Sequence, residues 1–223
     1  MCNLYSSRAP RELATQIFEV TDVHSSIGNM RPQSAVFPGY SAPIVAIGKT
    51  GDRSLVMSQW GFMTPKKSAR TGAWLKPSIW NNTRDDKLRS SNLWRSSFET
   101  RRCLIPVTAY AETTGRNPAT YHWFGICETE VFAFAGIWKY QKETVGKTPI
   151  DSVVHSMVTT NANDFVSSYH HRMPVVVSPN HFETWLSGSA VDAFDVIEPF
   201  PSAEMVLLGE GVGLKQWPVG TDN

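Results

Sequence analysis

The stretch RCLIPVTAY at residues 102–110 decides the fold class. It is a short, mostly apolar run, and such runs are typical of buried β-strands. Other segments of the same kind predict further strands: SLVMSQWGF (54–62), YHWFGIC (121–127), VFAFAGIW (131–138), SVVHSMVTT (152–160) and MPVVVS (173–178). Because most of these segments are joined by short links rather than long helices, we expect a curled, barrel-like, mainly antiparallel sheet with helices outside.

The segments between the strands predict turns and short helices. ETE (128–130) is short enough for a tight hairpin between its two flanking strands, and AETTGRNPAT (111–120) is a turn-rich connector. GEGVG (209–213) also predicts a turn. Helices are expected over residues 10–20, 161–170 and 178–188. Since no linker interrupts the chain, we predict a single α+β domain over residues 1–223.

Composition excludes several classes of protein. The chain has 223 residues, enough to bury a core, and it has no apolar run long enough for a transmembrane helix. Because the N-terminus lacks a basic region followed by an apolar run, we expect no signal peptide. Three cysteines without CxxC spacing argue against a disulfide framework and a zinc site, and they fit a reducing cytoplasm. The histidines and glycines form no metal or phosphate-loop signature, so we expect neither a metal nor a cofactor. We also expect a monomer located in the cytoplasm, associated with the nucleoid when it is bound to DNA.

Charge is distributed unevenly along the chain. The net charge is +1, but ten Lys and Arg residues stand against three Asp and Glu residues between Lys66 and Arg102. Aromatic residues lie among these cations, including Trp74. Cations that track phosphates and rings that stack on bases suit single-stranded nucleic acid, which makes Trp74 a candidate contact. The alternative interpretation is a solvated surface segment with its tryptophans packed inward.

Three polar positions could carry chemistry. Glu112 follows the strand at 102–110, and partial desolvation there would raise its pKa toward neutrality. In HHRMPVVV (170–177), His170 could carry a proton and Arg172 could anchor a phosphate, although a positively charged helix end would also explain them. Asn82 in WNNTR (80–84) could orient a reacting group, or it could simply favour a turn.

The second residue of the chain is the most unusual candidate. Removal of Met1 would leave Cys2 with a free α-amine and a thiol on neighbouring carbons, a pair that condenses with an aldehyde to a thiazolidine. The alternative is an ordinary cysteine packed in the core.

Several blocks of the chain occur in the order found in one family. They are Cys2 after Met1, NTR (82–84), RCLIP with its following glutamate (102–112), FAGIW (134–138), MVTTNAN (157–163) and HHRMPVV (170–176). Over nearly its whole length the chain therefore resembles the SOS response-associated peptidase (SRAP) family of abasic-site processing proteins. The resemblance implies a barrel-like α+β domain that binds single-stranded DNA and captures abasic sites covalently.

The resemblance also implies roles for individual residues. Cys2 matches the crosslinking cysteine, which forms a thiazolidine with the ring-opened sugar aldehyde. Asn82 matches the asparagine of the family's NAR block, Glu112 the glutamate after RCLIP, and His170 the first histidine of HxRMP. Removal of Met1, by self-cleavage or by an aminopeptidase, would explain the peptidase name, and the Schiff base would permit weak lyase activity.

Contacts to DNA are implied in the same way. Arg84 and Arg172 match arginines that hold DNA phosphates, and Thr159 matches a polar residue near the site. Three residues depart from the family pattern: Asn3 and Leu4 stand where the family has Gly and Arg, and Thr113 replaces a tryptophan. These departures put the mode of DNA binding in question more than the chemistry.

Two other functions are compatible with parts of the sequence. A conventional cysteine peptidase could use Cys, His and Asn, although a terminal nucleophile with a free amine does not favour it. A non-catalytic single-strand-binding module would explain the basic, aromatic segment alone.

Overall fold

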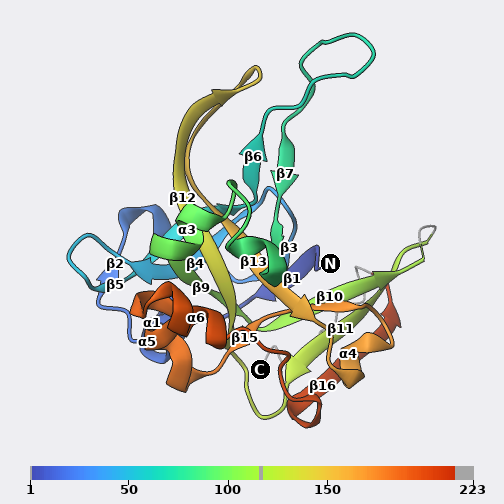
Figure 1. Ribbon diagram of the computed structural model, residues 1–223. Helices are drawn as coiled ribbons and strands as arrows, with labels where there is room; N and C mark the ends of the chain where they lie inside the picture. Colours follow the sequence, from blue (N-terminus) through green and yellow to red (C-terminus); the bar gives the residue numbers. More distant parts are fainter. Residues whose placement is uncertain (1, 116–117, 214–223) are drawn as a thin grey trace.

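Within residues 2–115 and 118–213, which the computed structural model describes, five strands close into a barrel at the centre of the molecule (Figure 1). They are β4 (Ser41–Ile47), β5 (Arg53–Trp60), β9 (Arg102–Val107), β12 (Phe132–Val145) and β13 (Thr148–Asn161). In the order β13, β12, β9, β4, β5 each strand pairs antiparallel with the next. Parallel pairing of β5 with β13, which sets Trp60 opposite His155, closes the ring.

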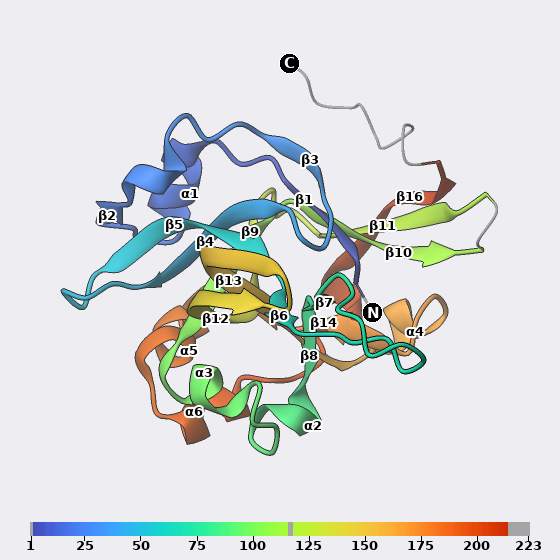
Figure 2. The ribbon, with the colours of Figure 1, turned by 90° about the horizontal axis from the view of Figure 1, so that it is seen from above.

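A second sheet lies beside the barrel and carries the N-terminal strand (Figure 2). Its order is β16 (Met205–Val212), β11 (Thr120–Ile126), β10 (Ala109–Thr114), β1 (Leu4–Ser7) and β3 (Gln33–Val36). Short strands extend the barrel sheet at its ends: β2 (Asp22–Val23), β8 (Asn82–Arg84), β14 (Arg172–Pro174) and β15 (Val176–Val177).

Short helices cover the face of the barrel away from the second sheet. They are α1 (Arg11–Ile17), α3 (Arg95–Thr100), α5 (Phe182–Ser187) and α6 (Ala190–Asp195), while α2 (Asp85–Leu88) and α4 (Asp164–Ser167) flank the site described below. Single 3-10 turns are η1 (Ser25–Ile27), η2 (Pro179–His181) and η3 (Ser202–Glu204). Because strand side chains alternate, Leu104 of β9 packs under the helices, while Ile105 packs toward the second sheet.

The predicted fold class is confirmed: the chain is α+β, with a barrel of mainly antiparallel strands flanked by helices. Each predicted strand segment contains a strand, and the predicted helices correspond to α1, α4 and α5. Asn163 caps α4 by accepting a hydrogen bond from the Val166 N–H, and α5 ends at Gly188.

Several predicted connections were wrong. The run at 102–110 is two strands, because the chain leaves the barrel at Thr108 and enters the second sheet. Residues 128–130 make the reverse passage, so β11 and β12 belong to different sheets and form no hairpin. Strand β10 continues to Thr114, which shortens the predicted connector, and residues 209–212 belong to β16 rather than to a turn.

Two arms project from the barrel (Figure 1). One is the outer part of the β12–β13 hairpin; the other, residues 62–80, contains β6 (Phe62–Thr64), β7 (Ser78–Trp80) and the loop between them. Gln141 of the first arm joins them, because its Nε2 donates to the Met63 carbonyl at 2.8 Å and its Oε1 accepts from the Met63 N–H at 3.2 Å.

Candidate functional site

Cys2 is buried where the chain enters β1, with an exposed fraction of 1%. Its thiol donates to the Leu4 carbonyl at 3.4 Å, and its own carbonyl accepts from Asn82 Nδ2 at 2.7 Å and from Asn81 Nδ2 at 3.3 Å. Parallel pairing of β8 with β13 sets the position of Asn82, opposite Met157. The backbone of Cys2 is therefore held by two side-chain amides from a distant part of the chain.

Glu112 belongs to β10, the strand that pairs with β1, and it lies next to Cys2. Only 3% of its surface is exposed, and burial raises the pKa of its carboxyl to about 7. Burial, and after it the charge of Glu112, raises the pKa of the Cys2 thiol well above its usual range. Glu112 can therefore exchange a proton near neutral pH beside Cys2, whose thiol holds its own proton firmly.

His170 follows α4 and is half-buried. The Arg172 N–H donates to its Nδ1 at 3.0 Å, and the ring of His171 stacks on it with centroids 4.4 Å apart. Burial lowers the pKa of His170. The Arg172 carbonyl also lies 2.9 Å from Nδ1, so the tautomer of the ring depends on which of these two backbone groups Nδ1 pairs with.

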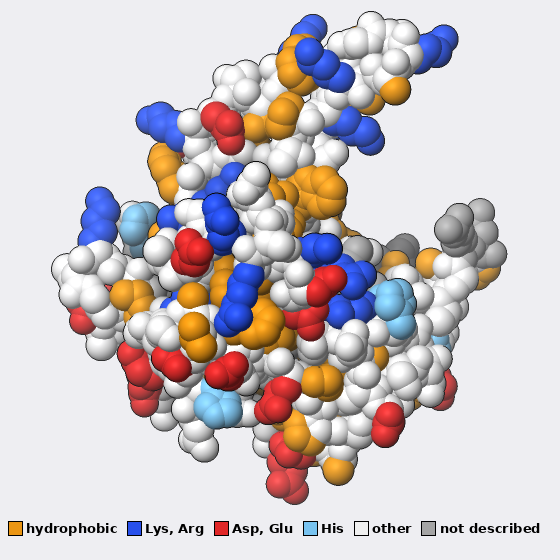
Figure 3. Space-filling view, in the orientation of Figure 1, with side chains coloured by type: hydrophobic (Ala, Val, Ile, Leu, Met, Phe, Trp, Pro, Cys, Tyr) orange, Lys and Arg blue, Asp and Glu red, His pale blue; other side chains and the backbone are white. Residues whose placement is uncertain are grey.

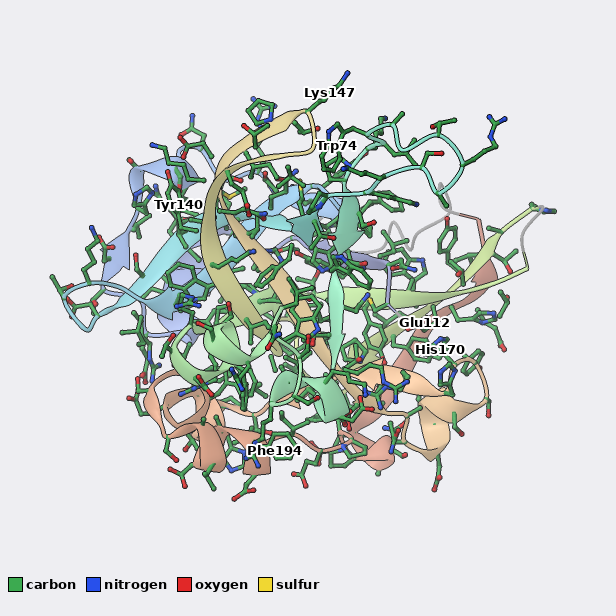
Figure 4. All side chains as sticks on the ribbon, turned by 45° about the horizontal axis from the view of Figure 1, so that its top comes forward. Trp74, Glu112, Tyr140, Lys147, His170 and Phe194 are labelled. Carbon is green, nitrogen blue, oxygen red and sulfur yellow. The ribbon has the colours of Figure 1, made fainter. Side chains whose placement is uncertain are left out.

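A second histidine, His122, lies between Glu112 and the segment that carries His170. His122 of β11 is directly opposite Glu112 of β10, and its ring lies against Tyr169 with centroids 4.6 Å apart. Tyr169 precedes His170, and Figure 4 shows Glu112 and His170 in the same region. The structure thus brings Cys2, Asn82, Glu112 and His170, the four residues singled out by the family resemblance, near one end of the second sheet.

Sequence reasoning missed three residues at this site: Asn81, His122 and Tyr110. The doubled asparagine in WNNTR could have pointed to Asn81. His122 and Tyr110 gave no local signal, because their approach to Glu112 and Cys2 depends on the pairing of β10 with β11 and β1.

The two predicted phosphate-binding arginines differ in exposure. Arg84 is exposed at the end of β8, where its Nε donates to Asp86 Oδ1 at 2.9 Å. Arg172 is buried, and its guanidinium donates to Asp85 Oδ1 at 2.8 Å and to Asn161 Oδ1 at 3.0 Å. Although burial opposes it, hydrogen bonds from Arg172 and Thr160 lower the pKa of Asp85.

The predicted DNA-contact residues Thr159 and Trp74 also differ from each other in exposure. Thr159 is fully buried and donates to the Thr83 carbonyl at 3.2 Å, which fastens β13 to β8. Trp74 is 41% exposed on the arm formed by residues 62–80, with Lys67 Nζ 4.4 Å from the centre of a Trp74 ring. It lies against Gly146 at the tip of the other arm, near Lys147 (Figure 4).

Cations gather on the arms (Figure 3). Those of the loop between β6 and β7 are Lys66, Lys67, Arg70 and Lys76. Among the described residues, no group of three or more His, Cys, Asp or Glu side chains could hold a metal ion. No helix in the described ranges is long and apolar enough to span a membrane. Met1, whose removal the sequence predicts, lies outside the described residues.

Comparison with known proteins gives one consistent result. The sequence model described as SOS response associated peptidase (SRAP) matches residues 1–209. The chain is 24% identical over 193 residues to the abasic site processing protein YoqW of Bacillus subtilis, covering 81% of this chain and 82% of that protein. It is 27% identical over 164 residues to the abasic site processing protein YoaM of the same organism, covering 72% and 68%.

Two solved structures have the same fold. A protein from Bacteroides thetaiotaomicron superposes with a TM-score of 0.74 at 20% identity, over 92% of this chain and 90% of that one. A protein from Bordetella bronchiseptica superposes with a TM-score of 0.72 at 19% identity, over 92% and 98%.

Proposed function

The chain belongs to the SOS response-associated peptidase (SRAP) family, and on that basis we propose that it captures abasic sites in single-stranded DNA covalently through Cys2. The observation that carries the proposal is the contact between the Asn82 amide and the Cys2 carbonyl, beside a buried Glu112. A core cysteine needs no such clamp on its backbone. A terminal nucleophile does, because its amine and thiol must both reach one carbon of the substrate.

The chemistry follows from the properties of these groups. After Met1 is removed, the α-amine of Cys2 attacks the aldehyde of the ring-opened sugar and forms a carbinolamine. Protonated Glu112 gives its proton to the leaving hydroxyl, so water departs and an iminium remains. The Cys2 sulfur then bonds to the same carbon, the C=N electron pair moves to nitrogen, and the thiol proton returns to Glu112. A pKa of about 7 lets one carboxyl perform both transfers.

His170 and Asn82 have supporting roles in this proposal. His170 would protonate the sugar ring oxygen as the deoxyribose opens. Asn82 would hold the peptide carbonyl of Cys2 and so direct its amine. The same carbonyl clamp, together with Glu112, would also serve self-removal of Met1, and the iminium would permit slow strand cleavage by β-elimination.

DNA would approach along the exposed edge of β8 and the two arms. Arg84 is two residues from Asn82 on one short strand, so a phosphate bound there lies near Cys2. Trp74 and Lys67 offer a ring and a cation for the flanking strand. The surroundings of Arg172 and Thr159 favour a different role, in which they hold β8, β13 and β14 together beneath the DNA.

Capture of an abasic oligonucleotide tests the proposal. The processed protein, verified by intact mass, is incubated with a single strand containing an abasic site or its tetrahydrofuran analogue, which has no aldehyde. We expect an SDS-stable adduct with the abasic strand alone. Cys2→Ala should abolish it, while the matched control Cys127→Ala, which alters an exposed free cysteine, should form it normally.

Binding to an intact single strand should change little in Cys2→Ala, because phosphate contacts supply most of the affinity. A normal adduct yield with Cys2→Ala would refute the thiazolidine. Equal binding of intact and abasic strands without any adduct would instead indicate a non-catalytic binding module.

A further inference from the structure

A pocket lies where β1 begins, beside the capture site. Its volume is about 160 Å³, and it is formed by the start of β1, the end of β10, the start of β11 and the residues that follow β3. We call it the β1–β10 pocket. Its lining residues include Asn3, Leu4, Phe37, Glu112, Thr113 and Tyr121.

The strand register explains the apolar part of the pocket. Leu4 of β1 is directly opposite Ala111 of β10, and Thr113 of β10 is directly opposite Tyr121 of β11. Side chains that are opposite each other, or two apart on one strand, share a face, so these four project from the same side of the second sheet. Leu4 and Ala111 are each 1% exposed, whereas Tyr121 and Phe37 are half-buried. The pocket therefore has a buried apolar floor and aromatic side walls.

The polar part of the pocket is joined to the capture site. Asn81 Nδ2 donates to Asn3 Oδ1 at 3.0 Å and also lies within hydrogen-bond distance of the Cys2 carbonyl, at 3.3 Å. With its oxygen engaged by Asn81, the exposed Asn3 amide offers its Nδ2 as a donor to a ligand. Since Asn3 follows Cys2 directly and Glu112 also lines the pocket, a group bound there lies next to whatever Cys2 captures.

Size and lining indicate which kind of group the pocket takes. Its volume is below the roughly 300 Å³ at which pockets for drug-sized ligands begin, so it suits one flat ring system rather than a whole nucleotide. Proteins recognise unpaired bases by stacking them on aromatic side chains and by donating hydrogen bonds to their edges. Phe37 and Tyr121 supply aromatic surface, and Asn3 supplies a donor. Asn3, Leu4 and Thr113, the three residues that depart from the family pattern, all line this pocket.

We propose that the β1–β10 pocket receives the nucleobase of the nucleotide next to the abasic site and so holds the abasic sugar at Cys2. This inference rests on the proposed function and deepens it, because it names the part of the substrate that lies beside the captured sugar. A base can enter the pocket only when it is unpaired, which suits a single strand. Because a base contact displaces no counterion, it adds affinity without adding to the salt dependence.

The test removes single bases from the DNA and single side chains from the pocket. Each oligonucleotide carries one abasic site, and a baseless tetrahydrofuran residue replaces the nucleotide directly 5′ of it, directly 3′ of it, or far from it. Capture is followed under single-turnover conditions at subsaturating protein. Tyr121→Ala removes one wall of the pocket. The matched control is Tyr40→Ala, which alters a tyrosine that is 54% exposed and does not line the pocket.

We expect the wild type to capture about fivefold or more slowly when the base on one side of the abasic site is missing, because that is the usual effect of losing one base–aromatic stack. Loss of the distant base should have little effect. Tyr121→Ala should capture the complete strand about as slowly as the wild type captures the strand without that base. It should also lose most of the dependence on that base, with an unchanged salt slope. Tyr40→Ala should match the wild type.

Two results would overturn the inference. One is a wild type that captures at the same rate with and without either flanking base. The other is a Tyr121→Ala variant that depends on the flanking base as strongly as the wild type does, since a mere folding defect slows capture of every strand alike. Thr113→Trp, a change at an exposed position, checks the same point by filling the pocket, and it too should remove the dependence on the base.

Binding of an unreactive strand separates this inference from the proposed function. In this strand tetrahydrofuran replaces the abasic site itself, and its affinity is measured with and without the flanking base. If the wild type forms no adduct with abasic DNA, covalent capture fails, and the affinities still test the pocket. If the adduct forms but neither its rate nor the affinity depends on a flanking base, only the pocket inference fails.

Discussion

At the scale of single residues, the candidate site places an amide donor and a buried carboxyl beside one cysteine. Asn82 holds the Cys2 backbone at 2.7 Å, and burial brings the pKa of Glu112 to about 7. His170 differs from both, because it is only half-buried and has its Nδ1 engaged by the Arg172 N–H. In the proposed function it is the imidazole that protonates the sugar ring oxygen.

This division predicts different substrate dependence for His170 and Glu112. His170→Ala should slow capture of abasic DNA more than capture of glycolaldehyde, because only the cyclic sugar needs its ring opened. Glu112→Gln should slow both by about 100-fold, the usual effect of removing a positioned acid–base group. Single-turnover rates on both aldehydes measure this, with the exposed His181→Ala as the control. Equal slowing of both substrates by His170→Ala would remove the ring-opening role.

At the scale of elements, β13 organises the wall of the site by pairing with β8 on one stretch and β14 on another. Arg84 ends β8 and faces solvent, whereas Arg172 begins β14 and is buried against Asp85, whose side chain is 20% exposed. The same residue type therefore has two environments: Arg84 is exposed with Asp86 as its partner, and Arg172 ties α2 to β14.

This difference predicts opposite results for the two arginines. Arg84→Ala should lower the log–log salt slope of single-strand binding by roughly 0.7 and leave the denaturation midpoint unchanged. Arg172→Ala should lower the free energy of unfolding by about 3 kcal/mol, because it leaves Asp85 without its partner. Salt titrations and chemical denaturation measure the two effects. In the double variant Arg172→Ala/Asp85→Ala, part of the lost stability should return.

Unchanged stability in Arg172→Ala together with a smaller salt slope would contradict the internal role of Arg172. It would instead support the phosphate contact implied by the family resemblance.

At the scale of the whole molecule, the barrel closes where His155 of β13 meets Trp60 of β5. His155 is fully buried, and its Nδ1 lies 3.0 Å from Ser58 Oγ on the neighbouring strand. Burial lowers the pKa of His155 from 6.5 to about 3. The closure therefore depends on a neutral imidazole.

A barrel closed in this way should lose stability in acid. Between about pH 6.5 and pH 3 the unfolded chain binds a proton at His155 that the folded chain excludes, so stability falls as the pH falls. At 1.36 kcal/mol per pKa unit, the contribution lost by pH 3 is at most about 5 kcal/mol. Denaturation of wild type, His155→Asn and the exposed control His181→Asn across this range measures it. The same pH dependence in His155→Asn as in wild type would contradict this origin.

Much of the local structure could be predicted from the sequence. The apolar runs around Leu104 and Phe134 are strands, Asn163 caps a helix, and the order of motifs points to Cys2, Asn82, Glu112 and His170. These features depend on residues near each other in the chain or on blocks matched one by one. The monomeric state and the domain boundary at residue 223 stay predictions.

Only the tertiary structure decided which strands pair and which side chains meet. It placed the passage between sheets at Thr108, set Tyr110 opposite Tyr5 and His122 opposite Glu112, and buried Arg172 while leaving Arg84 exposed. A strand's apolar pattern says which of its faces is buried, but it carries no information about the partner's identity or register. Those follow from the packing of segments as far apart as β1 and β10, where a shift of one residue would turn Glu112 away from Cys2.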